Sequence, residues 1–391
     1  LHIQATINDS NHCNAWKNLS ISYIRYKRLE EAKQAILKAI ELEPNLYNLH
    51  YLLGTILIRQ NKIKEAKAPL IQTIKLKPDF ADAYSNLGNL LKDLGESNES
   101  EIFLRKAINL KPNCAITHYN LGNALRDQGL LKEAKIAQEK AIYLKPDFTE
   151  AYLNLGKTLR DLGRLLESEK IFRNIISLNT SNLGDKLESS INIAIINLIG
   201  GNLPQTKIEI EKIERLIVQG GIELIKDNNN RSQTKIFFNY LKILSNQLKK
   251  SEKKSDLNQI KHIGESHCLS FAHQTLKLSS QEKSIQPIFI RGAKAWHFSN
   301  KGKNQWKSSF EAQINNTNIN EEVFVSFGEI DCRSDEGILY YSKKNKKDIN
   351  VVYKNTINSY LDYMEDKLNK ISSKRYYFGV PALTKVKDKL N

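Results

Sequence analysis

The sequence has few of the features that mark membrane, metal-binding or disulfide-stabilised proteins. No apolar run approaches the roughly 20 residues that a membrane-spanning helix needs. The four cysteines, Cys13, Cys114, Cys268 and Cys332, include no Cys-x-x-Cys pair. Their spacing therefore indicates no zinc site, and we expect no cofactor. A chain of 391 residues can bury a core without disulfides, which makes a reducing, cytoplasmic location the default expectation.

Negative charge is also scarce, since 59 lysines and arginines stand against 43 aspartates and glutamates and leave a net charge of +16. A basic balance can indicate a nucleic-acid partner. However, the two lysine-rich stretches, at 248–254 and 343–348, contain no aromatic residues on which bases could stack. We therefore interpret the lysines as solvated surface, and we expect neither a nucleic-acid partner nor a membrane span.

Proline is rare, yet half of the eight prolines recur at an interval of 34 residues: Pro44, Pro78, Pro112 and Pro146. A period of 34 is typical of the tetratricopeptide repeat, in which each unit is a pair of helices. Dividing the chain two residues after each proline predicts five repeats, at 13–46, 47–80, 81–114, 115–148 and 149–182. Residues 1–12 are expected to be the tail of a preceding repeat.

Positions within the five segments carry the same kinds of residue. Position four is aromatic or histidine, position eight is glycine in four repeats and serine in the first, and position twenty is alanine or serine. A small residue at position eight lets the second helix approach the first. Over residues 13–182 the chain resembles tetratricopeptide-repeat proteins, whose repeats stack into a helical solenoid with a concave inner face.

Asparagines recur at positions six and nine of the first helix, nearly one turn apart, so they form one stripe. Amide groups both donate and accept hydrogen bonds, which suits the backbone of an extended peptide. The candidate peptide-binding residues are Asn18, Asn86, Asn89, Asn120, Asn123 and Asn154. The stripe is similar to the asparagine ladder of O-linked N-acetylglucosamine transferases, which implies a protein or peptide partner on the concave face. Alternatively, asparagine simply tolerates a wet helix face.

The remainder of the chain changes character twice. Residues 183–250 keep a helical period without the repeat markers, which predicts degenerate repeats or capping helices. Residues 251–258 are interpreted as a linker. Beyond them we expect strands at 260–266, 285–292, 321–331 and 375–382, and helices at 268–277, 304–315 and 351–372. This alternation predicts a parallel α/β domain over 259–391, so the fold class is α followed by α/β.

Three polar turns are expected at the carboxyl ends of these strands, where ligands of parallel sheets bind. They are Gly264-Glu265-Ser266, the turn at Gly292, and Gly328-Glu329-Ile330-Asp331. Their order resembles the three blocks of the SGNH, or GDSL-type, hydrolases, which have a flavodoxin-like fold. The resemblance implies that Ser266 attacks an ester while the backbone N–H of Gly292 helps to bind the oxyanion. Glu329 and Asp331 occupy the third block, and His297 is the substitute candidate for the base.

Two features depart from that family. Ile330 stands where the family has an oxyanion-binding asparagine, and no Asp-x-x-His block follows, so we expect the domain to be incomplete at its C-terminus. Ser266 also fits a simple helix N-cap. Three functions therefore stay open: a repeat array coupled to a serine esterase, a non-catalytic scaffold with a degenerate α/β domain, and a repeat protein linked to glycosylation of proteins or glycans.

Overall fold

The structure is a computed structural model. It describes residues 12–225, 231–232, 234–235, 237–239, 241–242, 259–264, 275–278, 281–290, 295–299, 302–315, 322–327, 337–369 and 374–377. These residues fall into two compact units, one within 1–128 and 133–146 and the other within 129–132 and 147–391. The predicted linker at 251–258 lies outside the described residues.

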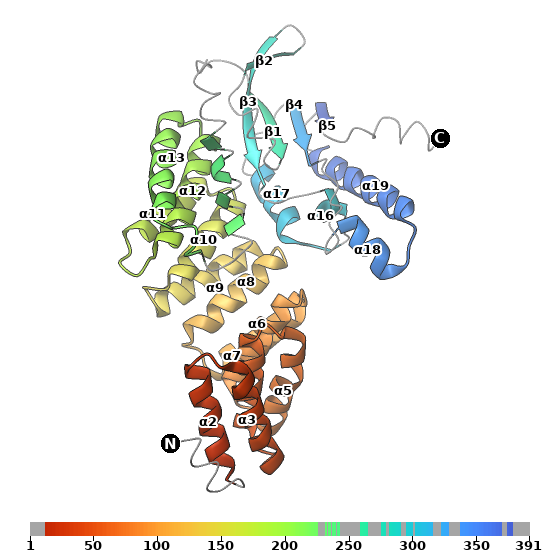
Figure 1. The fold of residues 1–391 in the computed structure, drawn as a ribbon. Helices are drawn as coiled ribbons and strands as arrows, with labels where there is room; N and C mark the ends of the chain where they lie inside the picture. Colours follow the sequence, from red (N-terminus) through yellow and green to blue (C-terminus); the bar gives the residue numbers. More distant parts are fainter. Residues whose placement is uncertain are drawn as a thin grey trace. The chain divides into compact units, whose positions relative to one another are not determined.

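The N-terminal region is an all-α solenoid, as the repeat pattern predicts (Figure 1). Successive pairs of its helices fall within the five 34-residue segments. The pairs are α2 (Cys13–Arg25) with α3 (Leu29–Leu42), α4 (Tyr47–Arg59) with α5 (Ile63–Leu76), α6 (Ala81–Asp93) with α7 (Ser97–Leu110), α8 (Ala115–Asp127) with α9 (Leu131–Leu144), and α10 (Thr149–Asp161) with α11 (Leu165–Ser177). Two further helices, α12 (Leu183–Ile199) and α13 (Leu203–Val218), follow.

The turn inside each pair uses the left-handed backbone region at position fifteen of the repeat. Three repeats place glycine there, with φ of 80°, 80° and 74° at Gly95, Gly129 and Gly163. The first two repeats adopt the same conformation with Lys27 and Asn61, at φ of 58° and 61°. A residue in this region ends a helix and lets the chain reverse. The turn is therefore set by the repeat position rather than by glycine alone.

Close contact between the paired helices explains the small residue at position eight. A Cβ atom placed on Gly88 would lie 2.6 Å from Cγ of the buried Leu104 and 3.2 Å from the carbonyl oxygen of Ser100. The hydroxyl of Ser100 in turn donates to the Gly88 carbonyl at 2.6 Å. The first repeat reverses the arrangement, with Ser20 at position eight donating to the Ala32 carbonyl at 2.8 Å. Positions eight and twenty therefore meet across each of these pairs.

The helix pair α12 and α13 continues the second unit beyond the last repeat. Asn182 and Asp185 form a capping box at the start of α12, each side chain accepting a hydrogen bond from the other's backbone N–H. α12 is buried along nearly its whole length, and its apolar residues pack with α13 and with the segment around Ile222 and Ile225. Its glycine near the start, Gly184, lies directly against the backbone of Leu224 and Ile225.

The C-terminal third contains a five-stranded sheet in the order β2-β3-β1-β4-β5. Its strands are β1 (Gln259–Gly264), β2 (Thr275–Leu278), β3 (Gln281–Phe289), β4 (Glu322–Ser326) and β5 (Lys374–Tyr377). β2 is antiparallel to β3, and the other neighbouring strands are parallel. The four parallel strands lie side by side in the order β3-β1-β4-β5.

Helices cover one face of this sheet. They are α16 (Ala295–Ser299), α17 (Gln305–Asn315) and α19 (Ile349–Leu368), and α18 (Gly337–Asn345) precedes the last of them. The buried side chains of Ile263, Ile288 and Val325 lie on the covered face and pack against Phe310 and Tyr360. The alternation of strand residues along β1 and β4 therefore leaves His262 and Ser326 on the opposite face.

One element predicted from the sequence is wrong over the residues that the structure describes. A helix was expected over 268–277, but Thr275–Leu278 forms the edge strand β2. The register pairs Leu278 with Gln281, so only two residues connect β2 to β3 as a hairpin. The alternating sequence Thr-Leu-Lys-Leu suits a strand, and its partner strand supplies the hydrogen bonds that an isolated four-residue segment lacks. Residues 265–274 lie outside the described residues.

Candidate functional site

The carboxyl ends of three parallel strands meet at one edge of the sheet. The last residue of β1, Gly264, pairs in register with Phe289 at the end of β3 and with Ser326 at the end of β4. The strand order reverses direction at β1, which is the topological switch point where ligands bind in such sheets. Each of the three expected motifs follows one of these ends within a few residues. Gly264 is the one residue of the first motif that the structure describes. The candidate site residues of the motifs lie outside the described residues: Ser266, Gly292, Glu329, Ile330 and Asp331.

A serine and a histidine are joined at this edge, although neither belongs to the expected nucleophile motif. Nε2 of His262 on β1 lies 2.9 Å from Oγ of Ser326 on β4. A serine bonded to a histidine is the arrangement that activates a nucleophile. Both side chains are buried, at 3% and 5% exposure, so they join the two strands inside the protein rather than at an open site. The two residues are 64 positions apart, and no sequence signal links them.

Replacing Ser326 by alanine should weaken the C-terminal third. The change removes a buried hydrogen-bond partner of His262, and such losses cost about 1–2 kcal/mol. The loss is measured as a shift of the urea unfolding midpoint. Ser342→Ala is the matched control, because it removes an exposed hydrogen bond to the Lys347 carbonyl and should change stability by less than about 0.5 kcal/mol. Equal effects of the two substitutions would contradict a buried pair.

His297, the substitute candidate for a base, lies in α16 and is buried at 4% exposure. Its ring stacks on Trp306 with the centroids 3.6 Å apart and the planes inclined by 6°. Its carbonyl oxygen accepts a hydrogen bond from the Asn304 side chain at 2.8 Å. These contacts give His297 a packing role at the start of α17, and its assignment as a base stays a prediction.

The first helices of the repeats present a second candidate site, within the first unit. Nδ2 of Asn86 on α6 donates to the hydroxyl oxygen of Tyr51 on α4 at 3.0 Å. The Tyr51 ring packs edge-on against Phe80, with centroids 4.9 Å apart. The bond fixes the orientation of the Asn86 amide, whose oxygen and second N–H can serve as acceptor and donor for a peptide backbone. Tyr51 is a site residue that the sequence pattern did not indicate.

Tyr51 on α4 and Lys92 on α6 have shifted pKa values. Burial, aided by the nearby Asp82 carboxylate, raises the pKa of Tyr51, so the phenol stays protonated at neutral pH. Burial lowers the pKa of Lys92, but the hydrogen bond and charge of Asp93 outweigh it and raise the pKa above its ordinary value. Lys92 therefore stays protonated at neutral pH, and its charge is paired with Asp93 at 2.7 Å.

The six asparagines differ in exposure, which the repeat pattern alone did not indicate. Asn18 is exposed, whereas Asn86, Asn89 and Asn123 are half-buried. Asn120 is buried, at 8% exposure. Asn154 is half-buried and belongs to the second unit. The stripe therefore consists of amides that are accessible to different degrees.

The comparisons with known proteins concern the repeat region. The family described as tetratricopeptide repeat matches residues 14–46, 81–114, 115–148 and 149–182. The segment 47–80 is not among the matches, but it folds into the helix pair α4 and α5 at the expected positions. No curated protein matches the chain.

Several solved structures are similar to part of the chain. YrrB, described as a tetratricopeptide-repeat protein with an unusual peptide-binding site, is 20% identical with a TM-score of 0.39 and covers 46% of this chain and 92% of its own. PilW, a type IV pilus biogenesis factor, is 22% identical with a TM-score of 0.48 and covers 52% and 92%. PilF of Pseudomonas aeruginosa is 18% identical with a TM-score of 0.46 and covers 52% and 91%.

Two kinds of feature are absent from the described part of the chain. None of the helices described there is both long and apolar enough to span a membrane. Within the same residues, no group of three or more His, Cys, Asp or Glu side chains is arranged to hold a metal ion.

Proposed function

We propose that this chain, whose N-terminal region is a tetratricopeptide-repeat solenoid, captures an extended segment of a partner protein on the first helices of the repeats. The observation that carries the proposal is the 3.0 Å bond between Asn86 and Tyr51. It joins the first helices of neighbouring repeats and holds an amide ready to pair with a peptide backbone.

The other asparagines have graded roles in this proposal. Asn18, Asn89 and Asn123 offer further amides along the first-helix stripe. Asn120 is too buried to contribute a full set of hydrogen bonds and is assigned a supporting role. Asn154 stands at the equivalent position of the fifth repeat, in the second unit.

Asn86→Ala should weaken peptide capture about fivefold to tenfold, because one peptide hydrogen bond and the anchor to Tyr51 are lost together. The probe is a fluorescent peptide selected from a random library on the full chain, and its affinity is measured by anisotropy. Replacing Asn120 by alanine should give a smaller loss, because its side chain is buried.

Asn109→Ala is the matched control for this measurement. Asn109 is an exposed asparagine on α7, the second helix of the same repeat, so its loss should leave the affinity unchanged. A peptide that binds Asn86→Ala as tightly as the unaltered chain would reject the role of the stripe. If Asn86→Ala and Asn109→Ala weaken peptide binding equally, the peptide does not bind specifically at the stripe.

A second candidate function is ester hydrolysis at the carboxyl edge of the sheet. It is supported by the register that aligns the ends of β1, β3 and β4 and by the strand order with a switch point at β1. Ser266 would attack the ester carbonyl, and the backbone N–H of Gly292 would donate to the oxyanion. Ile330 provides no donor, so one expected contribution to the rate, about 10²–10³-fold, is missing.

The test is hydrolysis of p-nitrophenyl acetate by the full chain and by Ser266→Ala. Turnover that disappears in Ser266→Ala supports the serine as nucleophile. Turnover that survives the substitution excludes it. A chain without measurable turnover favours the alternative, a non-catalytic scaffold whose α/β region has lost the activity.

A further inference from the structure

A basic pocket lies between α11, α12 and α13 in the second unit, apart from both candidate sites described above. Its volume is about 410 Å³, within the range of roughly 300–1,000 Å³ that is usual for small-molecule sites. Four cationic side chains line it, and no carboxylate does: Arg173, Lys186, Lys212 and Arg215. Ile176 and Leu216 add an apolar surface.

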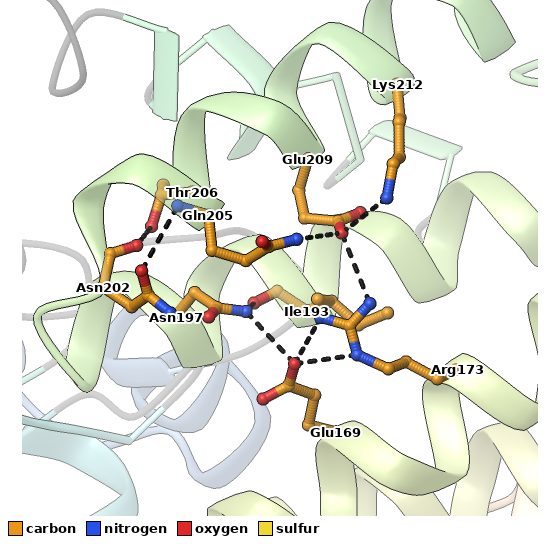
Figure 2. Close-up of polar contacts among 9 residues, drawn as sticks. All are labelled: Glu169, Arg173, Ile193, Asn197, Asn202, Gln205, Thr206, Glu209 and Lys212. Carbon is orange, nitrogen blue, oxygen red and sulfur yellow. Dashed lines mark hydrogen bonds and ion pairs between the residues drawn. The ribbon is translucent and has the colours of Figure 1, made fainter.

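Buried and half-buried carboxylates hold two of these cations in place (Figure 2). Oε1 of Glu209, which is fully buried, lies 2.9 Å from Nζ of Lys212 and 3.5 Å from a guanidinium nitrogen of Arg173. Glu169 contacts the same guanidinium group at 2.5 Å. Gln205 donates to Glu209 at 3.0 Å and completes the support. Arg173 and Lys212 are therefore positioned before any ligand arrives.

The other two cations are not compensated in this way. Among the described residues, neither Lys186 nor Arg215 forms an ion pair. Arg215 also lines an adjoining pocket with Glu211 and Glu214, but Glu214 pairs with Lys242 at 2.8 Å. Glu169 and Glu209 compensate two of the four cations that line the pocket. The remaining nearby carboxylate, Glu211, is exposed and lines the adjoining pocket, so two positive charges stay in the lining itself.

We propose that this pocket binds a phosphate monoester carried by a small organic molecule. A phosphate monoester has a charge near −2 at neutral pH, which matches the two uncompensated charges. Guanidinium groups bind phosphate oxygens through paired N–H donors, and lysines add point charges. Ile176 and Leu216 give the organic part of the ligand an apolar surface to contact. This site does not depend on the peptide-binding or esterase proposals.

The test is calorimetric titration of the full chain with phenyl phosphate, beside inorganic phosphate and benzoate. Phenyl phosphate should bind more tightly than either, because it alone combines a dianion with an apolar ring. Lys186→Gln and Arg215→Gln should each weaken its binding about tenfold, since each removes a charge-assisted contact. Both side chains are partly or fully exposed, and circular dichroism will verify that the variants fold.

Lys106→Gln is the matched control, because Lys106 is an exposed lysine on α7 in the other unit. It should leave the affinity unchanged. Phenyl phosphate binding that is insensitive to Lys186→Gln and Arg215→Gln, or equally sensitive to Lys106→Gln, would overturn the site. Benzoate binding as tight as phenyl phosphate would overturn the assignment to a dianion. A phosphoserine peptide that binds more tightly than phenyl phosphate would overturn the assignment to a small molecule.

Discussion

Lys157→Met is expected to destabilise the second unit by about 3 kcal/mol. Nζ of Lys157 on α10 lies 2.6 Å from Oε1 of Glu188 on α12, and the two side chains are only 14% and 10% exposed. Removing the lysine leaves the Glu188 carboxylate in a poorly solvated position without this partner. Removing one partner of a buried pair costs more than the net gain from the pair itself. Urea unfolding followed by far-ultraviolet circular dichroism measures the loss.

The double variant Lys157→Met with Glu188→Leu separates the cost of leaving Glu188 without Lys157 from the net contribution of the ion pair. Because it removes both charges and fills the space with apolar atoms, it should lie within about 1 kcal/mol of the unaltered chain. The neighbouring Arg160 supports the same interface, since it is buried and donates to Oδ1 of Asn192 on α12 at 2.6 Å. If Lys157→Met alone is as stable as the unaltered chain, then Lys157 and Glu188 do not form an ion pair in solution.

Gly184→Ala should have a comparable effect for a steric reason. A Cβ atom at this position would lie 2.7 Å from the carbonyl carbon of Leu224 and 2.8 Å from the backbone nitrogen of Ile225. Backbone atoms cannot rotate away as a flexible side chain can, so the segment after α13 must move. We expect a loss of about 3 kcal/mol, at the upper end of the usual cost of overpacking. This loss is the net value. It already includes the gain of about 1 kcal/mol that alanine brings over glycine inside a helix.

Gly200→Ala is the control at the other end of the same helix. The nearest atom to its added Cβ would be a carbonyl oxygen at 3.4 Å, and its φ of −71° is accessible to alanine. The substitution should change the unfolding midpoint little. If Gly184→Ala is as well tolerated as Gly200→Ala, then the segment at Leu224 and Ile225 does not pack against α12 in solution.

Much of the repeat region could be predicted because its features recur. The 34-residue period placed ten helices in pairs, and the small residues at positions eight and twenty indicated where the paired helices touch. In the third repeat these two positions are in direct contact, because the Ser100 hydroxyl donates to the Gly88 carbonyl. The turn position could be located from Gly95, Gly129 and Gly163, although Lys27 and Asn61 show that a glycine signal alone would have missed two of the five turns.

The candidate sites were less predictable because their contacts join distant residues. Asn86 was predicted from its position in the repeat, but its partner Tyr51 lies 35 residues away on another helix. Thr275–Leu278 was assigned to a helix, since a four-residue segment has little local preference and its hairpin partner decides its conformation. The motif residues after β1, β3 and β4 lie outside the described residues, so their roles stay predictions.

The amino-acid sequence alone therefore determined the helix pairs and the recurrence of asparagines on their first helices, because both depend on local periodicity. Tertiary packing decided which features became neighbours. It buried Asn120 while leaving Asn18 exposed, aligned Gly264 with the ends of β3 and β4, and gathered four cations in the lining of one pocket. Side chains far apart in the chain share a pocket only when the helices that carry them pack together, and local periodicity does not contain that information.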